Sequence, residues 1–145
     1  MMCLCKKFIF GLSVAILLTA CGGGGTSVPA TTVSFNPNPL SAACYQGQAG
    51  LDYSVTVVAT FGGTLPTGIV YVVIAFDNPG FTTFMNILPS GNIYTAQLSP
   101  DVSLVPGVYT GTVTVHLYKD SSFTSEYPLS GGTLPYTVTV TPGPI

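Results

Sequence analysis

The sequence predicts an all-β domain built as a sandwich of two sheets with about seven strands. From residue 31 onward, apolar residues alternate with hydroxyl-bearing ones, which is the period of half-buried antiparallel strands. Turn sequences rich in Gly, Pro and Asn separate the alternating segments. The same part of the chain shows no helical spacing of apolar residues with caps. Short strands divided by turns in this way are typical of an antiparallel sandwich.

Three segments alternate most regularly: residues 51–61, 109–117 and 136–140 carry apolar residues at every second position, with mostly Thr or Ser between them. We expect the apolar rows to face the core, because the branched Cβ of Thr suits a pleated strand while its hydroxyl stays in water. The other predicted strands are residues 32–35, 69–76, 81–88 and 93–98, and the predicted turns are residues 62–63, 78–80, 89–91, 106–107 and 131–132.

Residues 69–76 differ from the other predicted strands because they are apolar on both faces. One interpretation is a central strand whose outer face is covered by a loop or by the N-terminal segment. The other is an exposed apolar surface that binds a partner. We favour the covered strand, since a fully exposed strand of this kind promotes aggregation.

The first twenty residues have the pattern of a secretory signal peptide. Lys6 and Lys7 supply a positive start, and residues 8–18 form an apolar run that is too short to span a bilayer. Small residues follow the run, as they do before the cleavage site of such a signal. We therefore expect residues 1–20 to be removed and the remaining chain to lie outside the cytoplasm.

The end of this signal, Leu18-Thr19-Ala20-Cys21, resembles the lipobox of bacterial lipoproteins. The resemblance implies that signal peptidase recognises Leu18, Thr19 and Ala20 and cuts before Cys21. It also implies that the sulfur of Cys21 carries diacylglycerol, with palmitate as a further acyl group, so that the lipid anchors the chain in a membrane. Gly22 is not Asp, which by the sorting rule of enteric lipoproteins implies the outer membrane of the cell envelope.

The predicted organisation has four parts. Residues 1–20 are the signal peptide, and residues 21–30 are the lipidated Cys and a tether rich in Gly, Ser, Thr and Pro, whose composition predicts flexibility. Residues 31–142 form the sandwich domain, and residues 143–145 are a C-terminal tail.

Charge and cysteine content restrict the partners of this chain. Only 6% of the residues are charged, and Lys119 is the only Lys or Arg beyond the signal peptide. This composition excludes a basic patch for nucleic acid. Once Cys21 is acylated, Cys44 is the only thiol left; its apolar neighbours favour burial as a small core residue, and a disulfide to another chain is the alternative.

Residues 104–115, LVPGVYTGTVTV, resemble a run found in bacterial immunoglobulin-like modules, and the likeness extends over about residues 98–141. It implies an immunoglobulin-like sandwich. We expect Gly107 to permit a tight turn into the strand, and Tyr109 to return its hydroxyl to a nearby backbone carbonyl, as in a tyrosine corner. Many such modules carry two cysteines near residues 117–123; this chain has none there. The resemblance transfers no activity.

Few residues of this sequence are suited to catalysis or metal binding. His116 is the only histidine, and Asp120 is the only carboxylate close to it in sequence. A Gly-x-Ser-x-Gly motif is absent, and the acidic residues are scattered without the spacing of a calcium loop. We therefore expect no enzymatic activity, no cofactor and no metal.

The sequence contains eight tyrosines. Of these, Tyr118 and Tyr127 flank a predicted loop that also holds Phe123, and these three residues are our candidate binding surface. Taken together, the features predict a non-enzymatic, lipid-anchored envelope protein with a structural or protein-interaction role. The alternative is a surface adhesin or glycan-binding module that uses this loop; whether the domain faces the periplasm or the cell surface stays open.

Overall fold

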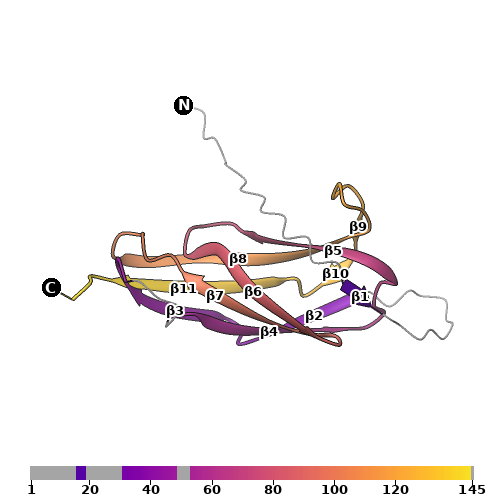
Figure 1. The fold of residues 1–145 in the computed structure, drawn as a ribbon, viewed down its shortest axis with the longest axis horizontal. Helices are drawn as coiled ribbons and strands as arrows, with labels where there is room; N and C mark the ends of the chain where they lie inside the picture. Colours follow the sequence, from indigo (N-terminus) through magenta and orange to yellow (C-terminus); the bar gives the residue numbers. More distant parts are fainter. Residues whose placement is uncertain (1–15, 19–30, 49–52, 145) are drawn as a thin grey trace, which may run out of the picture.

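The computed structural model describes residues 16–18, 31–48 and 53–144. Two sheets are formed from these residues, and the described ranges contain no helix. The strands run along the long axis of the molecule, with the loop before β9 and the C-terminus at opposite ends (Figure 1). The fold is an all-β sandwich, as the alternation predicted.

The first sheet has the strand order β1-β5-β8-β11-β3, and β9 also pairs with β8. Its strands are β1 (Ile16–Leu18), β3 (Leu40–Tyr45), β5 (Gly68–Phe76), β8 (Gly107–Tyr118), β9 (Glu126–Tyr127) and β11 (Thr133–Thr141). The second sheet has the order β10-β2-β4-β7-β6. Its strands are β2 (Thr31–Asn36), β4 (Val55–Gly62), β6 (Phe81–Ser90), β7 (Ile93–Pro100) and β10 (Leu129–Ser130).

The expectation of a wholly antiparallel sandwich is wrong at two pairs. Strand β3 pairs with β11 in parallel, and β10 pairs with β2 in parallel. Strands β2 and β3 belong to different sheets although only residues 37–39 separate them, and both Asn36-Pro37 and Asn38-Pro39 are cis. After this crossing the chain runs in the same direction as β11, which gives the parallel pair. Strand β3 was not among the strands predicted from the sequence.

The core follows the predicted alternation in β8 and β11. The apolar rows of these strands are buried, and their side chains belong to two apolar clusters between the sheets. The buried members of the two rows are Val113, Val115, Leu117, Leu134, Tyr136, Val138 and Val140. Pro135 is tolerated in β11 because pairing with β3 begins only at Tyr136, so its missing N–H removes no hydrogen bond from that pairing.

Tyr136 fixes the contact between β11, β8 and the turn after β5. Its side chain is 2% exposed, and its hydroxyl donates a hydrogen bond to the carbonyl of Asn78. Burial, together with the nearby charge of Asp77, raises the pKa of Tyr136 to about 12. Gly111 lies directly opposite in the ladder, where a Cβ would overlap the hydroxyl of Tyr136 and lie 2.6 Å from Oδ1 of Asp77. Glycine at this position is therefore a packing requirement.

We predict that Gly111→Ala lowers the free energy of unfolding by about 1–3 kcal/mol, because the added methyl overlaps groups that cannot move apart without breaking the Tyr136 contact. Urea unfolding measures the change. The matched control is Gly107→Ala on the same strand, where the nearest atom to a Cβ is 3.7 Å away and a near-neutral effect is expected. Equal losses in the two variants would contradict this account of Gly111.

Candidate functional site

The loop between β8 and β9 forms the candidate binding surface, and the register of the two strands decides which side chains share a face. Leu117 pairs with Tyr127, and Tyr118 pairs with Glu126. Because neighbouring residues of a strand point to opposite faces, Tyr118 and Glu126 lie on the outer face of the sheet. Leu117 and Tyr127 face the second apolar cluster instead.

Asp120 organises this loop through its carboxylate. Oδ1 accepts hydrogen bonds from the backbone N–H of Ser122 at 3.0 Å and of Thr124 at 3.2 Å, and from both of their hydroxyls. Oδ2 accepts the N–H of Ser125 at 2.8 Å. These bonds favour the ionised form, and they lower the pKa of Asp120 to about 2, with the Ser122 hydroxyl as the largest cause. The loop is thus a defined turn built around one carboxylate.

The turn directs Phe123 back onto the outer face of the sheet. Phe123 has a φ of 55°, which is uncommon for a residue other than Gly. Its ring meets Tyr118 edge to face at 5.5 Å between centroids and Tyr71 of β5 at 6.3 Å. The three rings form a cluster on the outer face, which we call the aromatic cluster.

The aromatic cluster covers part of strand β5, the segment that is apolar on both faces. Tyr71 lies under Phe123, and Val73, two residues on, is only 6% exposed. Ile69, at the start of the same outer row, is 54% exposed. On this outer row the burial of Val73 agrees with the covered-strand interpretation, whereas the exposure of Ile69 contradicts it.

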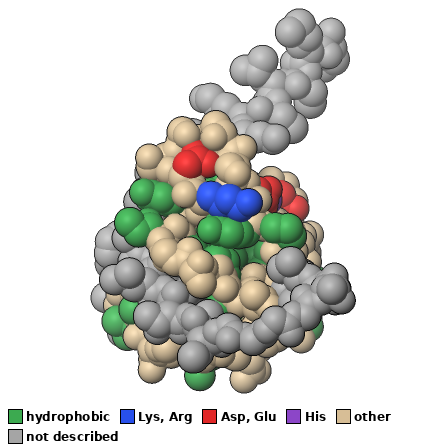
Figure 2. All heavy atoms as spheres, turned by 90° about the vertical axis from the view of Figure 1, so that its right-hand side faces the viewer, with side chains coloured by type: hydrophobic (Ala, Val, Ile, Leu, Met, Phe, Trp, Pro, Cys, Tyr) green, Lys and Arg blue, Asp and Glu red, His purple; other side chains and the backbone are tan. Residues whose placement is uncertain are grey.

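Tyr127 is not part of the aromatic cluster. It is half-buried against the second apolar cluster, and Nζ of Lys119 lies 5.0 Å from the centre of its ring. The structure therefore divides the three residues of the candidate surface between two faces, with Tyr118 and Phe123 on one and Tyr127 on the other. Figure 2 looks onto this end of the molecule, where basic, acidic and hydrophobic side chains lie next to one another.

His116 lies beside the aromatic cluster and pairs with a carboxylate that sequence reasoning missed. Its Nδ1 is 2.6 Å from Oε1 of Glu126, and its ring stacks on Tyr118 at 6.2 Å. The sequence neighbour Asp120 instead caps its own loop. Glu126 reaches His116 because β9 pairs with the end of β8, where Glu126 lies opposite Tyr118. A strand of two residues shows no alternation in the sequence, so this pairing could not be predicted. The pair links β8 to β9 on the outer face.

The two residues expected to shape the corner before β8 behave differently. The hydroxyl of Tyr109 donates a hydrogen bond of 2.8 Å to the carbonyl of Val105, four residues earlier. Gly107 does not have a positive φ, so the turn requires no glycine conformation there, contrary to our expectation. The corner therefore depends on Tyr109.

Cys44 is a core residue of the described structure. Its side chain is 3% exposed in the first apolar cluster, and the thiol forms no disulfide. Burial, with a smaller contribution from the charge of Asp101, raises the pKa of the thiol. Both effects favour an inert core residue over a disulfide to another chain.

Of the lipobox residues, Leu18 alone is described, and Thr19, Ala20 and Cys21 lie outside the described residues. Leu18 ends strand β1, which pairs antiparallel with Gly68–Val70 at the start of β5. Within the described ranges, no helix is long and apolar enough to cross a membrane. The same ranges hold no group of three or more His, Cys, Asp or Glu that could bind a metal ion.

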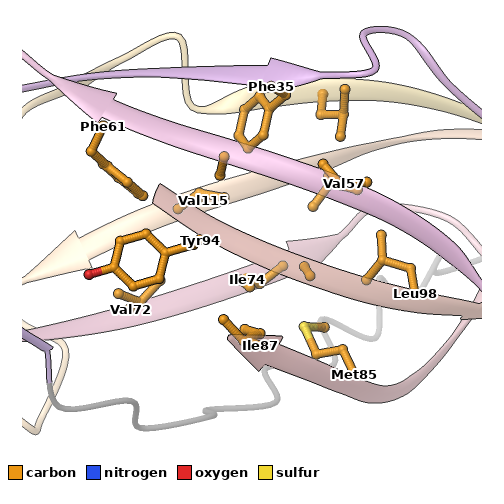
Figure 3. A pocket seen from close by; sticks show the side chains of 14 residues that line it. Phe35, Val57, Phe61, Val72, Ile74, Met85, Ile87, Tyr94, Leu98 and Val115 are labelled. Carbon is orange, nitrogen blue, oxygen red and sulfur yellow. The ribbon is translucent and has the colours of Figure 1, made fainter. Parts of the chain in front are cut away.

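An apolar cavity of about 70 Å³ lies between the two sheets. Figure 3 shows its lining, in which Val72 and Ile74 come from β5 and Met85 and Ile87 come from β6. The other described lining side chains are also apolar or aromatic, and Tyr94 is among them. The cavity lies behind β5, on the opposite face of that strand from the aromatic cluster.

Comparisons of the chain with protein-family models, with curated proteins and with solved structures each found no match.

We predict that acid loosens the loop only at very low pH. A carboxyl whose pKa is lowered on folding stabilises the folded form above its unfolded pKa of about 3.9, and this contribution is lost as the pH falls through about 2. An NMR titration of the Ser122 and Ser125 amides should therefore have its midpoint near pH 2. Asp120→Asn should abolish that transition and increase amide exchange in residues 121–125, whereas Ser121→Ala on the same loop should change neither. A midpoint near pH 4 would contradict the role of Asp120.

Proposed function

We propose that this chain is a non-enzymatic, lipid-anchored protein of the bacterial cell envelope, with a structural or protein-interaction role. The observation that carries the proposal is the sequence Leu18-Thr19-Ala20-Cys21 at the end of a signal-like apolar run. Cleavage before Cys21 would leave nine residues between the lipidated Cys and β2, which begins at Thr31. Fully extended, this tether would span about 30 Å.

We further propose that the sandwich is immunoglobulin-like. Immunoglobulin constant-type domains have one sheet of strands A, B, E and D and another of strands C, F and G. When these strands are lettered in chain order, β2, β4, β7 and β6 take the letters A, B, E and D, and β5, β8 and β11 take the letters C, F and G. Each set lies side by side in one sheet, as in that domain type. The hydrogen bond from Tyr109 to Val105 lies at the start of β8, the place of the tyrosine corner on strand F. Strand order and corner both support the assignment.

The lipid anchor predicts the behaviour of one substitution. Cys21→Ala removes the thiol that accepts the lipid, so the variant should accumulate as an unlipidated precursor that migrates more slowly and incorporates no labelled palmitate. Intact-mass measurement and metabolic labelling in a bacterial host test this. Cys44→Ala is the matched control, since its buried thiol plays no part in processing. Unchanged labelling of the Cys21→Ala variant would refute the lipoprotein proposal.

A second candidate function is glycan binding at the aromatic cluster, the adhesin alternative of the sequence reasoning. The loop with Phe123 lies in the connection between the strands that correspond to F and G, one of the loops that antibody variable domains use for binding. Tyr118, Phe123 and the His116–Glu126 pair place aromatic and polar groups next to one another on the outer face. Such a combination suits the apolar and hydroxyl surfaces of a sugar.

If the aromatic cluster binds glycans, Tyr118→Ala and Phe123→Ala should each weaken retention about tenfold in affinity electrophoresis through gels that contain soluble polysaccharides. The exposed Ser121→Ala on the same loop is the control. Thermal unfolding of every variant separates loss of binding from loss of fold. Retention that is equal in all variants would leave the protein-interaction role as the proposed function.

A further inference from the structure

We propose that the free edge of β5 in the processed chain pairs antiparallel with the same edge of a second copy, so that two of the sandwiches share one continuous sheet. The inference rests on the proposed cleavage before Cys21. The partner in the proposed protein-interaction role is then a second copy of the chain, and the surface is the edge of β5.

Strand β5 lies between β8 and the short strand β1 in its sheet. On one side it pairs with β8 over Tyr71–Phe76, and on the other side β1 pairs only with Gly68–Val70. Strand β1 precedes Cys21, so cleavage removes it. Within the described ranges no other strand lies on that side of β5. Among the described residues, Tyr71–Phe76 therefore already form a sheet edge, and processing extends that edge to all nine residues of β5.

The two described sheets have three other edge strands, β3, β6 and β10. Native sheet edges are protected against pairing by shortness, by Pro, by charge or by irregularity. Strand β6 has a register shift between Phe81 and Met85 and carries Pro89. Strand β3 has six residues and follows Pro39 directly, and β10 has two residues. Strand β5 has nine residues, pairs with β8 without a register shift, and contains neither Pro nor a charged residue. Among these described edge strands, β5 is the one longer than six residues that has neither Pro nor a register shift.

Strand β5 carries apolar side chains on both of its faces beside this edge. Ile69 is among the most exposed large hydrophobic side chains of the described structure, at 54%. Val72 and Ile74, on the opposite face, line the apolar cavity. A strand that pairs here would extend an apolar row on both faces, which favours an apolar partner strand over a polar one.

A second copy of this chain has the strand that such an edge would accept. The pairing with β1 shows that this edge takes an apolar strand in antiparallel orientation. Antiparallel pairing of β5 with itself about a two-fold axis satisfies both edges with one self-complementary contact. If the axis passes through Val72, Ile69 of one copy faces Ala75 of the other, and no like charges meet. Anchoring in one membrane would also raise the local concentration of the copies.

The test uses the full chain expressed in a bacterium, extracted in mild detergent and studied by sedimentation velocity over a range of concentrations. Intact mass reports separately whether residues 1–20 have been removed and lipid added. The wild type should form a dimer. Ile69→Lys, and more strongly Ile69→Lys/Ala75→Lys, should raise the dimer dissociation constant about tenfold or more, because Lys protects sheet edges. The matched control is Leu88→Lys on the edge strand β6, where the side chain is 57% exposed.

Hydrogen exchange gives a second readout that a change in folding would not mimic. Amides of residues 71–76 should exchange more slowly as the wild-type concentration rises, and those of β6 should not. A monomer at all concentrations, or a dimer that Ile69→Lys leaves intact, would overturn the pairing. A retained leader would refute the proposed processing, and a dimer that forms while the leader is retained would overturn pairing through the freed edge, because β1 would still occupy Gly68–Val70.

Discussion

The antiparallel pairing of β8 with β11 is the constraint on which the rest of the structure depends. Its register places Tyr136 opposite Gly111, and the absence of a side chain at Gly111 lets the buried tyrosine reach the carbonyl of Asn78. If either strand shifted by one residue, its own apolar row would turn toward solvent. The same register sets which residues of β8 face outward, so the positions of His116 and Tyr118 follow from a contact made in the core near the other end of the strand.

With so few charges, this sandwich is held together by burial and by backbone pairing. The described part of the chain contains one contact between a basic and an acidic side chain, that of His116 with Glu126, and it lies on the outer face. Exposed pairs of this kind contribute little to stability. Polar side chains act locally instead: Asp120 organises a loop, Asp77 accepts the N–H of Thr112, and Tyr109 closes a corner. Sheet edges then have few charged residues to protect them, which makes strand length, proline and register shifts decisive.

Strong alternation made β8 and β11 predictable, together with the burial of Tyr136, whereas the burial of Cys44 was predicted from its apolar neighbours. Strand β3 was missed because Leu40–Tyr45 has small residues where an alternating pattern would have large ones, and because its pairing with β11 is a long-range contact. The side of Tyr127 and the partner of His116 were also missed. Both depend on how β9 aligns with β8 after a turn, and that alignment comes from hydrogen bonds to Asp120, which leave no periodic signal.

Strand β5 has an outer face that Phe123 contacts and an edge without a neighbouring strand after processing. Contact with that face does not block pairing at the edge. The loop with Phe123 covers the outer face at Tyr71, whereas the edge runs perpendicular to that contact, in the plane of the sheet. A strand could therefore pair with β5 without displacing Phe123. Pairing of two copies would bring their aromatic clusters to the same side of one continuous sheet, because Tyr71 and Tyr118 lie on its outer face in each copy. A ligand with repeated units could then contact both clusters, and linked contacts of this kind raise avidity without any new type of contact. Dimerisation and glycan binding would in that case reinforce each other, although each stands on separate residues.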